Sequence, residues 1–164
     1  MIFVDFVQRV WYYNYRNKEM RCGTINKLYT MVGLPGSGKS TFTKNHTECI
    51  VISTDAIRAE LFGSEECQKN GSLVFEIAFK RIREALAQGC DVIFDATNIS
   101  RKARKSVFQF NAEHIAVFVN TDIEECKRRN AQRERHVPEF VIDKMASRLV
   151  APTVEEGFEK VLII

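Results

Sequence analysis

The 164-residue chain has no apolar run long enough to cross a membrane, and its cysteines form no C-x-x-C pair. The five cysteines, at positions 22, 49, 67, 90 and 126, stand singly and are odd in number, which predicts neither a disulfide framework nor a zinc site. The first seven residues lack a basic leader and a continuous apolar core, so a signal peptide is not expected. Together these absences predict a reduced, cytoplasmic protein that does not bind a membrane.

A strong excess of one charge is also missing. The 24 Lys and Arg residues stand against 21 Asp and Glu, which gives a net charge of +3 and a pI near 8.6. This balance permits a polyanionic partner without requiring one. The length and the hydrophobic content of 45% fit one domain, with a central sheet covered by helices on both faces.

Residues 1–26 differ from the rest of the chain. The stretch 11–16, WYYNYR, is aromatic and polar and has no clear period. An aromatic and basic mixture can stack on nucleic-acid bases. A poorly ordered extension, or a strand at the domain edge, explains the stretch as well, and we favour that interpretation. We therefore treat residues 1–26 as an N-terminal extension of unknown role and residues 27–164 as one domain.

The strongest motif is the stretch 33–41, GLPGSGKST, which fits the phosphate-binding pattern G-x-x-x-x-G-K-[ST]. An apolar run at 28–32 precedes it and a helix can open at Lys39, a context that a chance Gly-rich turn would not share. Small residues let successive backbone N–H groups surround an anion, while Lys39 can reach the β- and γ-phosphates and Ser40 can bind Mg²⁺. The motif therefore predicts ATP and Mg²⁺ as ligands. The nucleotide-binding residues expected from it are Gly33, Pro35, Gly36, Ser37, Gly38, Lys39, Ser40 and Thr41.

From Lys27 onward, strand-like and helix-like segments alternate. Strands are predicted at 28–32, 49–52, 91–95, 115–119 and 158–164, and helices at 39–46, 56–62, 72–88, 100–112, 121–133 and 138–150. This order predicts an α/β fold of the P-loop NTPase type, in which a five-stranded parallel sheet carries helices on both faces and a helical lid. The run 49–52 is expected to be buried on both faces, and Thr121 with Glu124 to form a capping box. Ligands bind beyond the carboxyl ends of such strands, so the residues that follow them should converge.

Asp55 follows the second predicted strand, and Arg58 lies three residues later on the same helical face. The carboxylate can accept the proton of a hydroxyl that attacks the γ-phosphate, and the arginine can hold an anionic acceptor. Alternatively, Asp55 only caps the helix that begins there. Its position at the catalytic edge of the sheet favours the catalytic interpretation.

Asp95 ends the third predicted strand, the usual position of a carboxylate that helps to hold Mg²⁺. Ala96 follows it, where hydrolytic ATPases commonly carry a glutamate, and this argues against a motor or switch. Thr97 and Asn98 either position the substrate or cap the next helix. Ser40 and Asp95 are therefore the predicted metal-binding residues.

Two groups of basic residues follow. Arg128, Arg129, Arg133 and Arg135 precede the Val137-Pro138 break, where a helix-turn-helix can close over a nucleotide and neutralise its charge. A solvated basic face explains any one of them equally well. The second group is Arg101, Lys102, Arg104 and Lys105, which either contacts a phosphate backbone or is simply solvated.

Five motifs in this order resemble the polynucleotide 5′-kinase branch of the P-loop kinases, over about residues 28–164. They are the stretch 33–41, the segment 53–58 (STDAIR), the segment 94–98 (FDATN), the segment 129–133 (RNAQR) and Val137-Pro138. The resemblance implies that Lys39 and Ser40 serve the phosphates and Mg²⁺, and that Asp55 is the general base on the 5′-hydroxyl. It also implies roles for the lid arginines Arg129 and Arg133, with Arg133 nearest the transferred phosphate.

On the acceptor side, the resemblance implies that Arg58 contacts the 3′-phosphate side and that Asp95 and Asn98 line the acceptor site. The D-x-D-G-T signature of the phosphatase domain that often accompanies such kinases is absent, and residues 1–26 are not part of the pattern. The resulting prediction is an ATP-dependent kinase that phosphorylates the 5′-hydroxyl of DNA or RNA, with Lys39, Asp55 and Arg133 as catalytic residues. One alternative is a kinase for a nucleoside, sugar or other metabolite, and another is a nucleotide-dependent switch or regulatory module.

Overall fold

The computed structural model describes residues 25–64, 70–134 and 136–164. The predictions for most of the N-terminal extension, for Cys22 and Cys67, and for Arg135 lie outside these residues. Within the described part of the chain, no helix is long and apolar enough to cross a membrane.

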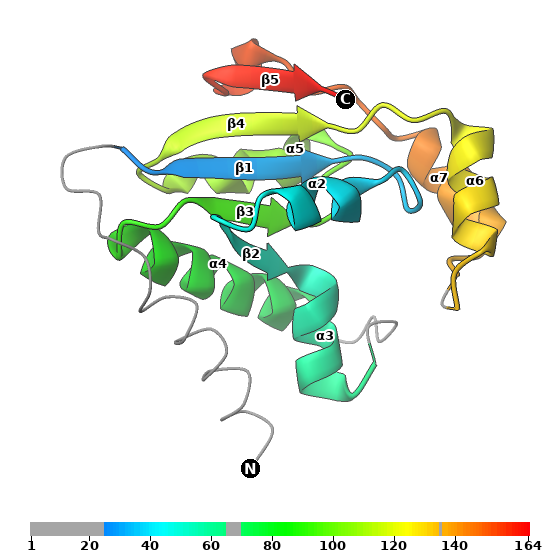
Figure 1. Ribbon diagram of the computed structural model, residues 1–164, viewed down its shortest axis with the longest axis horizontal. Coiled ribbons are helices and arrows are strands. Elements are labelled where there is room, and N and C mark those ends of the chain that lie inside the picture. The colour runs from blue at the N-terminus through cyan, green and yellow to red at the C-terminus, as the bar shows by residue number, and fades with distance from the viewer. Residues whose placement is uncertain (1–24, 65–69, 135) are drawn as a thin grey trace.

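The centre of the fold is a five-stranded sheet with strand order β2-β3-β1-β4-β5 (Figure 1), and every neighbouring pair is parallel. The strands are β1 (Lys27–Val32), β2 (Ile50–Ser53), β3 (Val92–Asp95), β4 (Glu113–Phe118) and β5 (Lys160–Ile163). Their carboxyl ends all point to the same edge, where α3, α6 and α7 gather (Figure 1). The predicted α/β fold with a five-stranded parallel sheet is confirmed.

Helices cover the two faces of the sheet unequally. The helices are α2 (Lys39–Asn45), α3 (Thr54–Phe62), α4 (Gly71–Ala87), α5 (Arg101–Lys105), α6 (Ile123–Ala131) and α7 (Glu139–Ala146), with 3₁₀ turns η1 (Ser106–Gln109) and η2 (Val154–Glu156). The larger core lies under α4 and η1, where Leu28 and Phe94 of the sheet meet Ile82 of α4. The smaller core lies under α2, whose Phe42 packs on Met31. Both cores fix the strands so that their carboxyl ends stay together.

The run 49–52 was expected to be buried on both faces, and this prediction is wrong. The strand β2 forms one border of the sheet, and its Val51 is 43% exposed. An apolar run is typical of a doubly covered strand, but α2 does not extend over this border. Ile52 packs in the core under α4, and Cys49 packs in the core under α2.

The predicted capping box at Thr121 and Glu124 is also wrong. Asp122 caps α6, because its carboxylate accepts hydrogen bonds from the backbone N–H groups of Glu124 and Glu125. The hydroxyl of Thr121 instead donates to the carbonyl oxygen of Ser37 at 2.7 Å. Thr121 therefore ties the start of α6 to the glycine-rich loop.

The helix expected at 100–112 is shorter than predicted, and it buries one of its basic residues. The helix α5 ends at Lys105 and continues as the turn η1. Arg104 is 0% exposed and its guanidinium forms two hydrogen bonds with Glu156, at 2.8 and 2.6 Å. It also donates to the carbonyl oxygens of Asn98 and Val150. Neither phosphate contact nor solvation accounts for Arg104, which joins three segments of the chain inside the protein.

Replacing Arg104 by methionine should lower the free energy of unfolding by about 3–5 kcal/mol, because the largely buried carboxylate of Glu156 would lose its closest ion-pair partner and keep only the more distant Arg101. Urea denaturation followed by circular dichroism measures this change. Lys102→Met is the control, because Lys102 is exposed on the same helix and its loss should cost less than about 0.5 kcal/mol. Equal stability of the two variants would contradict a structural role for the Arg104–Glu156 pair.

Candidate active site

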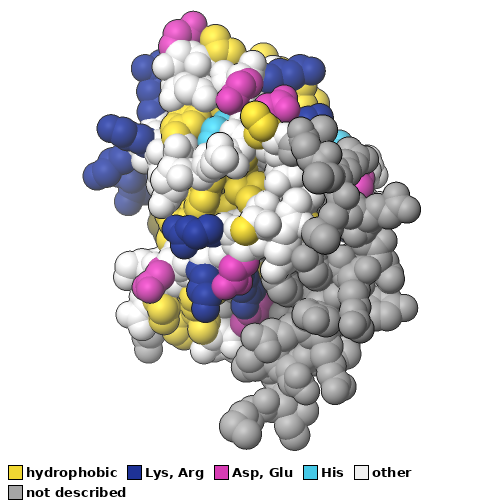
Figure 2. Space-filling model, turned by 90° about the vertical axis from the view of Figure 1, so that its left-hand side faces the viewer, with side chains coloured by type: hydrophobic (Ala, Val, Ile, Leu, Met, Phe, Trp, Pro, Cys, Tyr) yellow, Lys and Arg dark blue, Asp and Glu magenta, His cyan; other side chains and the backbone are white. Residues whose placement is uncertain are grey.

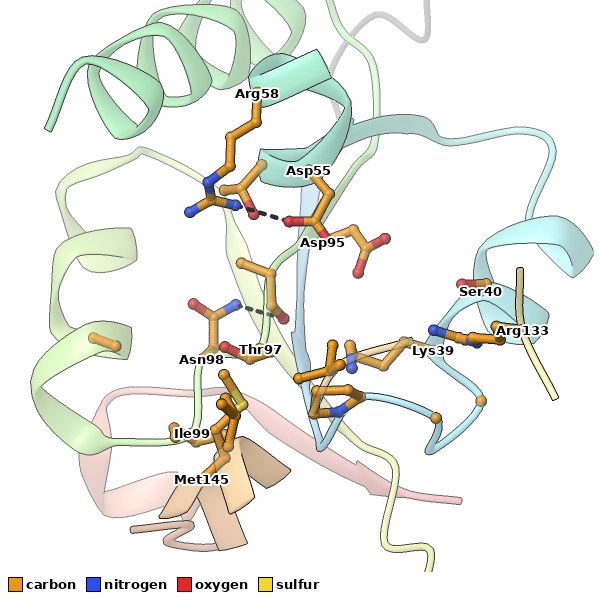
Figure 3. Close-up of a pocket in the computed structure, with 18 of the residues that line it drawn as sticks. Lys39, Ser40, Asp55, Arg58, Asp95, Thr97, Asn98, Ile99, Arg133 and Met145 are labelled. Atoms are coloured by element: carbon orange, nitrogen blue, oxygen red, sulfur yellow. Dashed lines mark hydrogen bonds and ion pairs between the residues drawn. The ribbon is translucent and has the colours of Figure 1, made fainter. Parts of the chain in front are cut away.

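Most of the predicted functional residues meet in one cavity of about 550 Å³ at the carboxyl ends of the strands, whereas Gly33, Ser37, Thr41 and Arg129 do not line it. One end of the cavity is polar and is lined by Lys39, Ser40, Asp55, Arg58, Asp95 and Arg133. The other end has an apolar wall that includes Ile99, Val137, Val141 and Met145, and Figure 3 shows Ile99 and Met145 on the side away from Lys39 and Arg133. The cavity thus joins charged groups suited to phosphate chemistry with a surface suited to an apolar or aromatic group.

The glycine-rich loop connects β1 to α2 and has the backbone conformation that its sequence requires. Gly36 and Gly38 have φ values of +81° and +111°, which side-chain-bearing residues rarely adopt. A Cβ atom on Gly36 would lie far inside the van der Waals distance of the carbonyl oxygen of Cys126 in α6. The loop and α6 can therefore pack together only because residue 36 is a glycine.

Replacing Gly36 by alanine should lower the free energy of unfolding by more than about 1–2 kcal/mol and weaken ATP binding at least about tenfold, because the clash with Cys126 adds to the backbone strain. Thermal melts and calorimetric titration with ATP measure the two effects. Gly63→Ala is a matched control, since Gly63 has a φ of +70° but nothing within 4 Å of the added Cβ. Gly63→Ala should show the strain alone and bind ATP normally. Normal ATP binding by Gly36→Ala would contradict this packing argument.

Lys39 begins α2 and points back across the loop. Its Nζ donates hydrogen bonds to the carbonyl oxygens of Gly33 and Leu34, at 2.9 and 2.8 Å. Burial lowers the pKa of Lys39, and the charge of Arg133 acts in the same direction, whereas Asp95 opposes them. Burial raises the pKa of Asp95, and the charge of Lys39 opposes that rise. Lys39 and Asp95 therefore stabilise each other's charged forms.

Ser40 and Asp95 line the same cavity and present the hard oxygen donors that Mg²⁺ takes as ligands. No group of three or more His, Cys, Asp or Glu residues in the described ranges could hold a metal ion. A hydroxyl and one carboxylate fit Mg²⁺, which usually keeps several waters and binds through phosphate oxygens. The donor atoms of Ser40 and Asp95 thus fit Mg²⁺, and their metal-binding role stays a prediction.

Asp55 is held at the polar end of the cavity by the start of α3. Ser53 caps this helix, because its hydroxyl accepts a hydrogen bond from the N–H of Ala56, so Asp55 does not have the capping role considered for it. Oδ1 of Asp55 accepts a hydrogen bond from Arg58 at 2.8 Å, drawn as a dashed line in Figure 3. Nε of Arg58 is buried without a hydrogen-bond partner. A buried unpaired donor beside a carboxylate fits a site that receives an anionic acceptor.

Asn98 lines the cavity but is 4% exposed, and its side chain serves the backbone. Its Nδ2 donates to the carbonyl oxygen of Met31 at 2.9 Å and lies 3.5 Å from that of Ala96. Ser100 caps α5, so the capping role considered for Thr97 and Asn98 is wrong. Asn98 has a φ of +45°, which marks a strained turn in the wall of the cavity. Contact between Asn98 and a substrate stays a prediction.

The lid arginines occupy different positions. Arg133 lines the cavity, whereas Arg129 lies over the glycine-rich loop with Nη1 3.4 Å from the carbonyl oxygen of Ser37. Arg128 is 60% exposed and pairs with Glu125, as a solvated basic face predicts. Hydrogen bonds from Arg128 and Arg129 lower the pKa of Glu125 to about 2. Glu125 therefore stays ionised at any pH near neutrality and keeps Arg129 beside the loop.

Some site residues were not singled out from the sequence. The apolar wall comes from α7 and the loop after β3, and Thr121 and Asn130 hold the lid in place. Val141 and Met145 are spaced i and i+4 on a predicted helix, a signal that does not separate a core face from a cavity wall. The buried contacts of Thr121 and Asn130 have no signature in the sequence.

A second cavity, of about 560 Å³, lies at the amino ends of the strands. It is lined by Ile25, Leu86 and Phe110 together with Arg83, whose guanidinium carbon lies 5.9 Å from the centre of the Phe110 ring. Figure 2 shows the molecule from this side, with acidic and basic side chains both present among hydrophobic ones. Among the described residues, no carboxylate lines this second cavity, so it lacks the combination of carboxylates, lysine and glycine-rich loop found at the opposite edge.

Comparisons with known proteins agree with this geometry. The family model AAA_33, described as an AAA domain, matches residues 28–152. An L-seryl-tRNA(Sec) kinase of Methanococcus maripaludis is 26% identical over 144 residues, covering 80% of this chain and 56% of that protein. A protein of Acanthamoeba polyphaga mimivirus, named as a bifunctional polynucleotide phosphatase/kinase, is 25% identical over 170 residues, covering 96% and 37%. The chain therefore spans about half or less of the length of these curated relatives.

Among solved structures, a chain of the Pnkp1/Rnl/Hen1 RNA repair complex superposes with a TM-score of 0.69. It is 23% identical, and the match covers 80% of this chain and 47% of that one. At this identity the likeness concerns the fold alone.

Proposed function

The chain belongs to the AAA_33 family of AAA domains, and from that premise we propose that it is an ATP-dependent kinase that phosphorylates a hydroxyl group, namely the 5′-hydroxyl end of DNA or RNA. The observation that carries the proposal is the cavity itself, where a phosphate-binding loop, a carboxylate and two arginines face an apolar wall. We take residues 27–164 as the kinase domain and the cytoplasm, where ATP is plentiful, as its location.

In the proposed reaction, the acceptor oxygen attacks the γ-phosphorus of ATP. A new P–O bond forms, the bond to the β,γ-bridging oxygen breaks, and ADP leaves with that electron pair. Asp55 accepts the proton of the hydroxyl, a role that its position at the polar end of the cavity supports. Arg58 holds the carboxylate in place and has its Nε available for a phosphate of the acceptor.

Charge on the transferring group is stabilised from two sides. Lys39 extends from the start of α2 and Arg133 from the segment after α6, and both line the cavity. Cationic donors fixed before the reaction stabilise the transition state without the cost of reorganising solvent. Ser40 and Asp95 would hold Mg²⁺, which would supply positive charge next to the phosphates.

The apolar wall favours a nucleic-acid acceptor over a sugar. A polyol acceptor needs several hydrogen-bonding side chains, because each buried hydroxyl left unpaired costs free energy. Ile99, Val141 and Met145 offer none, but they can pack against the face of a nucleobase. The name of one curated relative, a polynucleotide phosphatase/kinase, supports this choice.

Transfer of label from [γ-³²P]ATP to a panel of acceptors tests the proposal. We expect labelled product with short 5′-hydroxyl DNA or RNA oligonucleotides and none with the same oligonucleotides carrying a 5′-phosphate. Labelling of free nucleosides, sugars or other metabolites alone would identify a small-molecule kinase. Release of labelled inorganic phosphate without any labelled acceptor would identify a nucleotide-dependent switch.

A further inference from the structure

Asn130 is a polar side chain inside the lid that has no role in the reaction proposed above. It lies in the last turn of α6 and is 2% exposed. Its Nδ2 donates a hydrogen bond to the carbonyl oxygen of Val137 at 2.8 Å, and its Oδ1 accepts one from the N–H of Val137 at 2.9 Å. The carboxamide thus binds both backbone groups of a residue seven positions away. Only an amide side chain supplies a donor and an acceptor in this arrangement.

These two bonds, which we call the Asn130–Val137 clasp, hold residues 130 and 137 together. Arg133 follows Asn130 by three positions, and its N–H donates to the carbonyl oxygen of Asn130 at 3.2 Å. The side chain of Arg133 lines the cavity, and its charge acts on both Lys39 and Asp95. The clasp therefore fixes the backbone of Arg133 relative to Lys39 and Asp95.

The helix that carries Asn130 is itself fixed to the glycine-rich loop. Thr121 at its start donates to Ser37, and the backbone of Cys126 lies directly against Gly36. Ile142 of α7 packs with Cys126 in a small apolar cluster and is fully buried. A continuous set of contacts thus leads from the phosphate-binding loop through α6 to Asn130.

We propose that Asn130 is a positioning residue that holds Arg133 ready to stabilise the transferring phosphoryl group. The proposal rests on the proposed kinase function and on the role of Arg133 within it. An arginine on an unrestrained loop would sample many positions, and a displacement of about 1 Å can cost about 100-fold in rate. The clasp restricts this motion before ATP arrives, so its loss should affect the chemical step more than the binding of ATP.

A double-mutant cycle with Asn130→Ala and Arg133→Ala tests this inference. Arg133→Ala should lower kcat by about 10²–10³-fold, as the loss of one transition-state donor does. Asn130→Ala alone should lower kcat by about 10–100-fold and change the KM for ATP by less than about threefold. In the Arg133→Ala background, Asn130→Ala should lower kcat by less than about threefold, because residues that act as a unit are not additive.

Asn120→Ala is the control. Asn120 is exposed in the connection between β4 and α6, so its replacement should leave kcat unchanged. If Asn130→Ala proves too unstable to purify, Asn130→Ser replaces it, because the hydroxyl adds no charge, and its single oxygen cannot replace the separate donor and acceptor atoms that bind Val137. Its kcat should then fall between those of the wild type and Arg133→Ala.

The outcomes separate the inference from the proposed function. Multiplicative losses in the double mutant, or an unchanged kcat in Asn130→Ala, would overturn the positioning role while leaving the kinase activity in place. An unchanged kcat in Arg133→Ala would overturn it too, because Asn130 would have no catalytic group to position. Failure of the wild-type chain to label any acceptor would instead contradict the proposed function.

Discussion

Replacing Asp55 by alanine is expected to lower the turnover of phosphoryl transfer by about 10²–10⁴-fold while changing the Kd for ATP by less than about threefold. The carboxylate lies at the polar end of the cavity, where we propose that the acceptor binds, whereas Lys39 and the glycine-rich loop, which we propose bind the phosphates, belong to another segment. Removal of a general base slows the proton transfer and leaves the nucleotide contacts intact. Single-turnover transfer to a 5′-hydroxyl oligonucleotide, together with calorimetric titration with ATP, measures the two quantities.

The Asp55→Asn variant keeps the shape of the side chain and should lose as much activity, because the amide cannot accept the proton. Glu60→Gln is the matched control, since Glu60 lies on the same helix and pairs with Arg81 through bonds of 3.1 and 2.5 Å. It loses the same charge away from the cavity and should retain near-normal turnover. Parallel loss of transfer and ATP binding in Asp55→Ala would mean that Asp55 is a structural residue.

Replacing Lys39 by methionine should lower the turnover by about 10²–10³-fold, because one buried cationic donor to the phosphates is lost. The change should also allow the pKa of Asp95 to rise, since the charge of Lys39 now opposes the effect of burial on that carboxyl. The residual activity of Lys39→Met should therefore disappear at a higher pH than that of the wild type as the pH is lowered. Turnover measured between pH 5 and 8 at saturating ATP and Mg²⁺ records both effects.

Lys44→Met serves as the control for this second variant. Lys44 is exposed in the last turn of the same helix, so its loss should change neither the turnover nor the pH profile. Lys39→Arg should not restore activity, because the wider planar guanidinium does not match a site built for one compact ammonium group. Retention of more than about a tenth of the wild-type turnover by Lys39→Met would refute the assignment of Lys39 as a transition-state donor.

Much of the architecture was accessible from the chain itself. The alternation of apolar runs and helical periods predicted five parallel strands, and the glycines and Lys39 predicted the phosphate-binding loop. Because parallel strands end at one edge, the rule for ligand position also brought Asp55 and Asp95 toward that loop. These are local properties, in which each residue's role depends on neighbours a few positions away.

Other expectations failed where a side chain found a distant partner. Arg104 was expected to be one of four basic surface residues, yet it is buried, because it pairs with Glu156. That partner lies 52 positions further along the chain. Thr121 read as a helix cap but binds the carbonyl of Ser37, 84 positions earlier. The apolar run of β2 was expected to be buried on both faces, but β2 is the strand at the border of the sheet.

The sequence by itself thus determined the kind of chemistry: a strand, a glycine-rich turn and a lysine at fixed spacing can cradle phosphates wherever the rest of the chain goes. The packing of distant segments was needed to show which buried contacts surround Arg133 and that an apolar wall lies opposite the charges. The reason is physical. Backbone turns and helix ends follow from adjacent residues, whereas the partner of a buried polar group is chosen by which segments of the chain pack together.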